Sequence, residues 1–361
     1  MEEVVALFKD GDSIIVSGFY DFGRPLTLLR AIHQAGIRDI DLVTNDIATP
    51  GEGAAPLVVD GRVSRVTTTF VGSFRDVNTR LKELVDSGRM SMTFVPQGTL
   101  VERIRAAGAG IAGFYTPTGV GTEVAEGKEV REIGEKRFLF ETALTARFGL
   151  VKAWKADRMG NLQMRGTERN FAIAVAKACE TTIAEAEIIL DRPLDPECVH
   201  VPHNFVDHVV QSEMGPKGVF GAQASARIDP SEELIARRAA LELADGEVVN
   251  LGVGIPTLVV NYIPGDMKIW LQSESGVLGM GPVPSREEDI LPSVIDAGRK
   301  YVTVNEYGMF FDSTDSFVMI RGGHIDTAIL GALEVDQLIR AGPAGQPGRL
   351  PVVPCPGRGE T

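Results

Sequence analysis

The sequence predicts an α/β protein built from two related, open and mostly parallel sheets with covering helices. Short apolar runs bounded by Gly, Asp or Pro alternate with segments of helical spacing in the first half of the chain. A glycine-rich pattern near the start returns after the middle of the chain. Strands that alternate with helices form parallel sheets, and the returning pattern indicates that the second sheet repeats the first.

The first sheet is expected from five apolar runs. They predict strands at residues 13–16, 40–43, 63–68, 92–95 and 148–151. Apolar residues recur at helical spacing in residues 26–35 and 100–107, which predicts a helix in each segment.

The second part of the chain echoes the first. Asp10-Gly11 and Asp245-Gly246 each lead through apolar residues to further glycines and a proline. An apolar strand follows in both copies, ending at Asn45 in the first and at Glu274 in the second. Functional residues are therefore expected at both strand ends, although two glycine-rich turns can also be alike by chance.

Composition shifts divide the chain into domains. We expect one domain at residues 1–210, a Gly- and Pro-rich linker at 211–230 and a second domain at 231–338. A helix is predicted to begin after the linker, with Ser231 as its N-cap. Ten of the last 22 residues are Gly or Pro, so residues 339–361 are predicted to be a disordered tail.

Composition and charge are those of a soluble enzyme. Of the 361 residues, 44% are apolar and 24% charged, and the formal net charge of −13 argues against nucleic-acid and anionic-membrane partners. No stretch is long and apolar enough to predict a membrane span. Three widely spaced cysteines favour reduced thiols, and the sequence opens without a leader-like segment, so a cytoplasmic location is expected.

Glu274 is the candidate nucleophile. It follows the apolar run at residues 269–271 and precedes Gly276, Gly279 and Gly281. Ligands of open α/β sheets bind at the carboxyl ends of strands, and glycines there let the backbone approach a ligand closely. The alternative is an ordinary solvated charge in a surface loop.

The flanking residues identify a family resemblance. The segments that carry it are residues 10–25, 95–105, 250–256, 273–279 and 321–324. Residues 273–279, SESGVLG, are similar to the Ser-Glu-Asn-Gly signature of the family I 3-oxoacid coenzyme A transferases. The resemblance covers about residues 1–335, as an α half followed by a β half in one chain.

The chain departs from the family's pattern in several places. Ser275 stands where the family has Asn, Ser17 where it has Gly, and Asp46 where it usually has a second Asn after Asn45. The resemblance also stops before the family's β half ends. We therefore expect a C-terminally incomplete β half, with lower activity and stability than a homologue that has the whole of it.

The resemblance implies an enzyme that moves coenzyme A between succinyl-CoA, or another acyl-CoA, and a 3-oxoacid such as acetoacetate or 3-oxoadipate. Glu274 would carry the coenzyme as a glutamyl thioester. Asn250 and Gln97 would donate hydrogen bonds to the developing oxyanion, and Asn45 would line the pocket for the acyl carboxylate. The glycines expected at the coenzyme are Gly252, Gly254, Gly276 and Gly279. Coenzyme A is a substrate here, so no cofactor or metal is expected, and the partners are an acyl-CoA, an acid and further copies of the chain.

Other interpretations stay open. A catalytically silent homologue could act as a binding scaffold, and a changed neighbour of the nucleophile could admit water and give an acyl-CoA hydrolase. Gln97 and Asn45 could be ordinary structural amides. His200, His203 and His208 lie near Cys198, but their apolar surroundings favour packing over a metal site.

Overall fold

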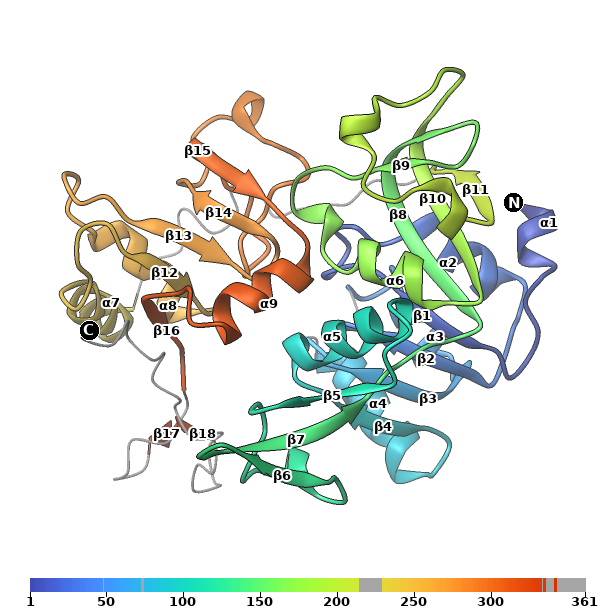
Figure 1. Ribbon diagram of the computed structural model, residues 1–361, viewed down its shortest axis with the longest axis horizontal. Coiled ribbons are helices and arrows are strands. Elements are labelled where there is room, and N and C mark those ends of the chain that lie inside the picture. The colour runs from blue at the N-terminus through green and yellow to red at the C-terminus, as the bar shows by residue number, and fades with distance from the viewer. Residues whose placement is uncertain (48, 73–74, 214–228, 333, 336–340, 343–361) are drawn as a thin grey trace. The chain divides into compact units, whose positions relative to one another are not determined.

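The apolar runs and helical segments of the sequence form two separate α/β sheets, each with its own helices (Figure 1). The computed structural model describes residues 1–47, 49–72, 75–213, 229–332, 334–335 and 341–342. Unit 1 consists of Met1–Thr118 and Lys128–Lys217, and unit 2 of Gly119–Gly127 and Gly218–Thr361. Gly119–Gly127, which lies within the first expected domain, groups with the second unit.

The main sheet of unit 1 has the strand order β11-β10-β8-β1-β2-β3-β4, and all neighbours along this path are parallel. Its strands are β1 (Ser13–Val16), β2 (Ile40–Thr44), β3 (Val63–Thr68), β4 (Ser91–Phe94), β8 (Phe148–Asp157), β10 (Thr181–Leu190) and β11 (His208–Gln211), with β9 (Leu162–Gln163) paired antiparallel to β8. The five predicted strands are all present, and β8 continues to Asp157.

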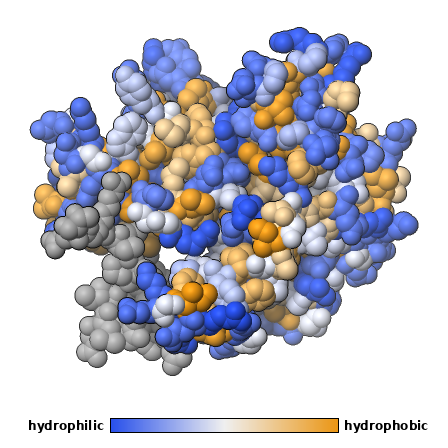
Figure 2. Space-filling view, viewed as in Figure 1, coloured by the Kyte–Doolittle hydropathy of each residue, from blue (hydrophilic) through white to orange (hydrophobic). Residues whose placement is uncertain are grey.

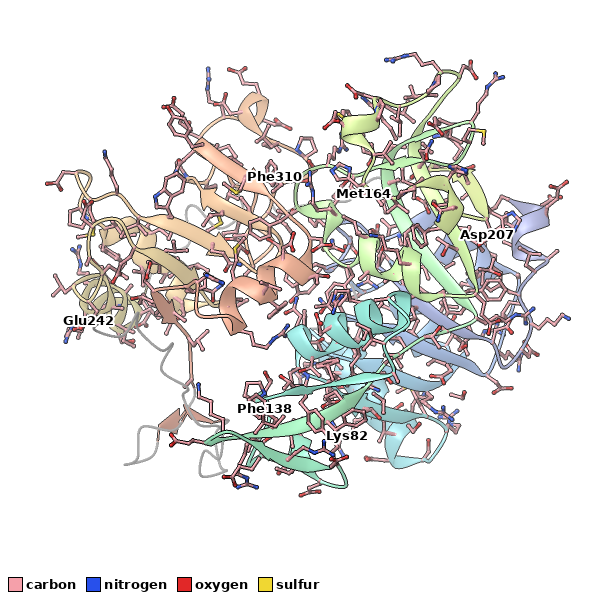
Figure 3. All side chains as sticks on the ribbon, in the orientation of Figure 1. Lys82, Phe138, Met164, Asp207, Glu242 and Phe310 are labelled. Carbon is pink, nitrogen blue, oxygen red and sulfur yellow. The ribbon has the colours of Figure 1, made fainter. Side chains whose placement is uncertain are left out.

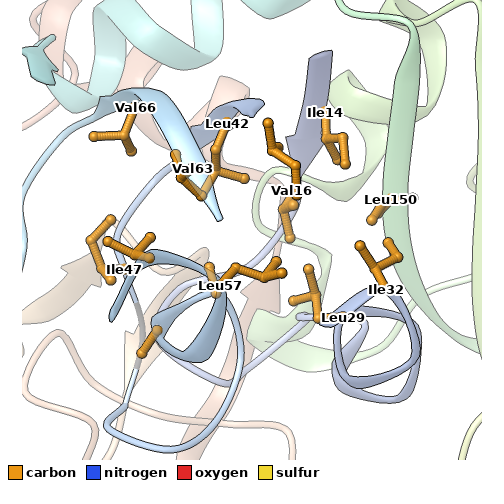
Figure 4. Close-up of a cluster of buried hydrophobic side chains, with 14 of the residues drawn as sticks. Ile14, Val16, Leu29, Ile32, Leu42, Ile47, Leu57, Val63, Val66 and Leu150 are labelled. Atoms are coloured by element: carbon orange, nitrogen blue, oxygen red, sulfur yellow. The ribbon is translucent and has the colours of Figure 1, made fainter. Parts of the chain in front are cut away.

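Helices lie on both faces of this sheet. They are α1 (Glu2–Val5), α2 (Leu26–Gln34), α3 (Ala55–Val59), α4 (Arg75–Asp86), α5 (Gln97–Gly108) and α6 (Ala172–Ala178), with the 3-10 helices η2 (Gly166–Arg169), η3 (Pro196–Cys198) and η4 (His203–Phe205). Leu29 and Ile32 of α2 and Leu57 of α3 pack with strand residues such as Leu42 and Leu150 in one buried cluster (Figure 4). This burial of apolar surface stabilises the unit.

Helix α6 covers the opposite face. A Cβ on Gly149 of β8 would lie 3.0 Å from Cys179 Sγ and 3.2 Å from the Val175 carbonyl oxygen, so glycine there permits close packing of α6. Helix α5 packs against α6. The carboxyl ends of β1 to β4 therefore emerge between two helical layers.

A small antiparallel sheet inserts after α5. It has the order β5-β7-β6, with strands β5 (Gly113–Thr116), β6 (Val130–Ile133) and β7 (Lys136–Thr142), and the 3-10 helix η1 (Glu123–Ala125) precedes β6. The strand predictions did not include this sheet.

Unit 2 contains a five-stranded sheet with the order β15-β14-β13-β12-β16. Its strands are β12 (Val248–Leu251), β13 (Trp270–Ser273), β14 (Val277–Met280), β15 (Val304–Phe310) and β16 (Thr327–Ile329), and its helices are α7 (Pro230–Ala240), α8 (Ile255–Leu258), η5 (Val259–Tyr262), η6 (Glu287–Asp289) and α9 (Ser313–Arg321). The pairs β12–β13 and β12–β16 are parallel, whereas β13–β14 and β14–β15 are antiparallel.

The internal repeat is visible in the strand pairing. Strand β12 pairs in parallel with β13 and β16, as β1 pairs in parallel with β2 and β8. Asn45 follows β2 and Glu274 follows β13, so the two residues occupy corresponding strand ends of the two sheets.

The segment between the units differs from the expectation at both ends. Gln211 still belongs to β11, and α7 begins at Pro230. Asp229, not Ser231, is the N-cap, because its carboxylate accepts the Ser231 backbone N–H at 2.8 Å, and the proline at the first helical position has no N–H to satisfy. Residues 214–228 of the predicted linker lie outside the described residues.

The predicted tail at 339–361 also lies outside the described residues, apart from two. The backbone of Ala341–Gly342 (β18) pairs antiparallel with that of Glu334–Val335 (β17). Hydrophilic residues cover much of the face drawn in Figure 2, with smaller hydrophobic areas among them. Within the described ranges, no helix combines the length and hydrophobicity that a membrane crossing requires.

Candidate active site

Glu274 occupies a tight turn between two antiparallel strands. Ser273 and Val277 pair across the β13–β14 ladder, and the Gly276 N–H donates to the Ser273 carbonyl at 3.0 Å. The turn therefore places Glu274 directly beyond the last residue of β13. The predicted place of the Glu274 carboxylate at a strand end is confirmed.

Gly276 makes this turn possible. Its φ is +106°, which L side chains rarely adopt, and a Cβ would lie 2.1 Å from the Phe311 carbonyl oxygen. The Phe311 N–H in turn donates to the Gly276 carbonyl at 3.1 Å. The segment after β15, whose last residue Phe310 is labelled in Figure 3, thus holds the turn through its backbone.

The Glu274 side chain is partly buried. Burial raises the pKa of Glu274, hydrogen bonds from its own backbone N–H and from the Asn250 side chain lower it, and the charge of Asp296 raises it further. Desolvation dominates, so the net pKa shift is upward. A desolvated carboxylate held by a few donors is more reactive than a hydrated one.

Asn250 reaches Glu274 from the neighbouring strand. It lies in β12 opposite Gln272 of β13 in the parallel register. Asn250 is 5% exposed, and its Nδ2 donates to Gln272 Oε1 at 2.6 Å. The structure therefore brings together Glu274 and Asn250, two of the residues that the sequence singled out.

Asp296 is a site residue that the sequence analysis missed. It is 5% exposed, its backbone N–H donates to the Lys300 carbonyl at 2.9 Å, and its carboxylate accepts the Lys300 N–H at 2.8 Å. Burial raises the pKa of Asp296, and the negative charge of its ionised carboxylate raises the pKa of Glu274. The signal was present, because Asp296 interrupts an apolar run that ends in Gly298, as Glu274 does before Gly276.

Ser275 connects the turn to the segment that carries Asp296. Its hydroxyl donates to the Ile295 carbonyl at 3.0 Å and lies 2.9 Å from Ser273 Oγ. Ser275 is 1% exposed. The residue that departs from the family signature therefore has a structural contact inside unit 2.

The four glycines proposed to contact coenzyme A have different surroundings. The Gly252 N–H donates to the Ile329 carbonyl at 2.9 Å, so the sheet already uses it. A Cβ on Gly279 would lie 2.8 Å from Gly308 Cα, which explains that glycine by packing. Gly254 has a φ of +89°, and among the described residues no atom lies within 4 Å of the place a Cβ would take. Contact with the coenzyme stays a prediction for all four.

Asn45 and Gln97 lie at one edge of the unit 1 sheet. Asn45 follows β2, and Gln97 begins α5 directly after the segment that leaves β4. Strands β2, β3 and β4 are parallel neighbours, so their carboxyl ends share this edge. The four proposed polar residues thus fall into two pairs, Glu274 with Asn250 in unit 2 and Asn45 with Gln97 in unit 1.

Asp46 sets the surroundings of Asn45. Its Oδ2 accepts the Asn45 Nδ2–H at 3.1 Å and the Tyr20 backbone N–H at 2.9 Å. Asn45 is 1% exposed, and in the described part of the chain its Oδ1 has no hydrogen-bond partner. The amide nitrogen of Asn45 is therefore directed toward Asp46, and its oxygen is directed away.

The histidines near Cys198 do not form a metal centre in the described structure. His200 Nδ1 accepts the backbone N–H of Met164, a residue labelled in Figure 3, at 3.1 Å. Among the residues that the structure describes, no group of three or more His, Cys, Asp or Glu side chains is arranged to hold a metal ion.

Comparison with known proteins identifies relatives of both halves. The family model described as coenzyme A transferase matches residues 1–212 and 232–348. Rat succinyl-CoA:3-ketoacid coenzyme A transferase 2A, mitochondrial, is 39% identical over 356 residues, which are 91% of this chain and 68% of the relative. The human succinyl-CoA:3-ketoacid coenzyme A transferase 2, mitochondrial, is 38% identical over 366 residues, which are 93% and 69%.

The first half and the fold have further counterparts. Acetate CoA-transferase subunit alpha of Escherichia coli K12 is 38% identical over 214 residues, which are 59% of this chain and 96% of the relative. The crystal structure of the acyl-CoA transferase YdiF from Escherichia coli O157:H7 has a TM-score of 0.75 at 21% identity, over 94% of this chain and 70% of that chain. The predicted α/β duplication is confirmed.

One expectation is wrong by these comparisons. The rat, mouse and human relatives matched over both halves are named as mitochondrial proteins, which contradicts the expected cytoplasmic location.

Proposed function

The chain belongs to the coenzyme A transferase family, and we propose that it moves coenzyme A between succinyl-CoA, or another acyl-CoA, and a 3-oxoacid such as acetoacetate or 3-oxoadipate, through a thioester on Glu274. The names of the relatives support the substrate class. The observation that carries the proposal is the place of Glu274 in the turn directly after β13, next to the strand that carries Asn250, whose side chain lowers the pKa of Glu274.

The chemistry conserves the thioester and needs no external energy. The Glu274 carboxylate attacks the thioester carbonyl of the donor, so that an acyl-glutamyl anhydride forms and coenzyme A leaves as a thiolate. The thiolate then attacks the glutamyl carbonyl, which releases the donor acid and leaves coenzyme A bound to Glu274. The acceptor acid reverses both steps and leaves as its own thioester.

Asn250 suits this chemistry because it donates without carrying a proton that Glu274 could take. Its N–H stabilises negative charge on the carboxylate before the reaction and on the glutamyl oxygen when the thiolate attacks. Removing one such donor typically costs about 3 kcal/mol of transition-state stabilisation. The partly buried position of Glu274 also limits the access of water to the anhydride and thioester.

A covalent adduct tests the proposal. The protein is incubated with succinyl-CoA or acetoacetyl-CoA without an acceptor, and the intact mass and peptide masses are measured. We expect coenzyme A on the peptide that contains Glu274 and its loss in Glu274→Gln. Glu242→Gln is the matched control, because the Glu242 side chain, two residues after α7, is 63% exposed (Figure 3), and this variant should keep the adduct. An adduct on Cys179 or Cys198 would contradict the proposal.

Steady-state kinetics separate transfer from its rivals. A relay through one covalent intermediate predicts parallel lines in double-reciprocal plots when acid and acyl-CoA are both varied. Release of free coenzyme A without an acceptor acid would instead indicate a hydrolase, and a folded protein with neither reaction would indicate a binding scaffold.

A further inference from the structure

The orientation of the Asn250 side-chain amide decides whether an N–H or an oxygen faces Glu274. A side-chain amide has an N–H face and an oxygen face of nearly the same shape. If the Asn250 nitrogen faces Glu274, the amide donates to the carboxylate, whereas an oxygen in that place would repel it. The neighbours of Asn250 must therefore set its direction.

A chain of buried hydrogen bonds sets that direction from a backbone carbonyl. A carbonyl can only accept, so the contact of 3.5 Å between Ser316 Oγ and the Ser273 carbonyl oxygen makes the hydroxyl its donor. Ser316 Oγ is then free to accept Gln272 Nε2–H, at 2.7 Å. This bond directs the other end of the Gln272 amide, Oε1, toward the nitrogen of Asn250 at 2.6 Å.

A second contact gives the same direction. Asn250 Nδ2 also lies 3.4 Å from the backbone carbonyl oxygen of Gln272, which again can only accept. Two independent acceptors therefore require nitrogen at this end of the Asn250 amide. Both acceptors belong to Gln272 and can share one N–H, which leaves the second N–H for Glu274.

We propose that Gln272, held by Ser316, is a positioning residue that keeps the Asn250 amide with its N–H toward Glu274. The inference rests on the proposed role of Glu274 for its catalytic meaning, but the orientation itself depends only on the contacts above. Sequence separation hides it, because Ser316 is 44 residues from Gln272 and reaches it from helix α9.

The hydrogen bonds from Ser316 through Gln272 to Asn250 form a relay, and burial makes it specific. Gln272 and Ser316 are 0% exposed and Asn250 is 5% exposed, so water cannot readily replace a missing partner. Reversing the Gln272 amide alone would set its nitrogen against that of Asn250, and reversing both amides would give up the donations to the Ser273 and Gln272 backbone carbonyls. Ser316 of helix α9 thus sets the direction of the hydrogen bond from Asn250 to Glu274, which lies two residues after Gln272.

The relay has a measurable consequence for Glu274. The Asn250 hydrogen bond lowers the pKa of Glu274 against the upward effect of burial and of the Asp296 charge. Loss of the relay should therefore raise the pKa of Glu274 and move the ionised, nucleophilic form to higher pH. Asp296, whose own carboxyl accepts the Lys300 N–H, is the titratable neighbour that must be held constant in the comparison.

Two changes break the relay at different points. Ser316→Ala removes the acceptor of Gln272, and Gln272→Leu removes the partner of Asn250 at nearly constant volume. Ser316→Thr keeps the hydroxyl and should rescue. Ser313→Ala is the matched control, because Ser313 is a 1% exposed serine of the same helix outside the relay.

The readout is the ionisation of Glu274 itself. The carboxyl infrared band is titrated in each variant and compared with the same variant carrying Glu274→Gln. We expect a higher pKa of Glu274 in Ser316→Ala and Gln272→Leu and no change in Ser313→Ala. The rate of adduct formation per folded protein at pH 7 should fall about tenfold or more in the two relay variants.

The outcomes separate this inference from the proposed function. An unchanged pKa of Glu274 in folded Ser316→Ala would overturn the positioning role, and so would failure of Ser316→Thr to restore it. If Gln272→Leu does not fold, the serine pair decides alone. A shifted pKa in a protein that never forms the Glu274 adduct would leave the orientation standing and reject the proposed function.

Discussion

Arg24 and Asp46 form a completely buried ion pair at the carboxyl end of the unit 1 sheet, with Arg24 Nη2 3.0 Å from Asp46 Oδ1. Arg24 also donates to Thr44 Oγ1 at 2.9 Å, and the second oxygen of Asp46 accepts from Tyr20 and Asn45. Asp46 stands where the resembling family usually has Asn. The departure therefore adds a charge that Arg24 neutralises and that directs the Asn45 amide.

Replacing Asp46 by Asn should destabilise the protein strongly. The variant keeps the shape but leaves the Arg24 guanidinium buried without its counterion, and breaking a buried pair costs about 3–5 kcal/mol. Urea unfolding measures the change. Asp12→Asn is the control at the opposite end of β1, because its partner Arg147 is 40% exposed and the expected loss is smaller, about 1 kcal/mol. Equal losses in both variants would contradict the argument.

The raised pKa of Glu274 predicts that the difference in unfolding free energy between Glu274→Gln and the parent protein depends on pH. The folded protein holds its proton to a higher pH than the unfolded chain does, so folding loses stability as pH rises between the two pKa values. Glu274→Gln cannot ionise and escapes this loss. Its free energy of unfolding, relative to the parent protein, should therefore increase from about pH 4 upward until the folded pKa is passed. A gap that does not vary with pH would show that burial does not dominate.

Glu168 predicts a second pH dependence, in unit 1. It is 3% exposed, and burial followed by the charge of Glu187 raises its pKa from 4.5 to about 7, against the lowering effects of Arg165 and Lys152. Stability from the protonated carboxyl is complete below about pH 4.5 and is lost as pH rises to about 7, by about 3 kcal/mol in all. Glu168→Gln cannot ionise at this position. Chemical denaturation from pH 4 to 8.5 should therefore show that the variant does not lose this stability as the pH rises.

Glu187→Gln provides the test of cause. It removes the like charge, so the pH window in which Glu168 ionises should move downward. If the denaturation profile of Glu187→Gln matched that of the parent protein, the charge of Glu187 would not contribute.

The turn after β13 should tolerate no side chain at Gly276. Gly276→Ala places a Cβ 2.1 Å from the Phe311 carbonyl at a φ of +106°, so a loss of more than about 3 kcal/mol and of adduct formation is expected. Gly254→Ala is the matched control, because the space for its Cβ is open in the described structure, so only backbone strain at a φ of +89° and a ψ of −132° is expected, about 1–3 kcal/mol. Thermal unfolding of both variants measures the difference, and similar losses would refute the packing argument.

Much of the fold follows from local pattern. The strands at β1 and β3 have the predicted bounds, because apolar runs bounded by turn residues leave little choice of conformation. The inserted sheet of β5, β6 and β7 was missed, since β6 is exposed throughout and both β6 and β7 carry charged residues. The N-cap of α7 was placed two residues late, because Asp229 and Ser231 are both good capping residues and only the backbone direction chooses between them.

The sequence by itself determined the chemistry available at the two strand ends: a carboxylate before a glycine that permits a tight turn, and amides at corresponding places in the two halves. Tertiary structure decided how those groups are directed. Asn250 meets Glu274 because parallel register sets it opposite Gln272, and Ser316 orients Gln272 from a helix 44 residues away. Hydrogen-bond direction depends on which partners burial brings within about 3 Å, and local sequence pattern does not contain that information.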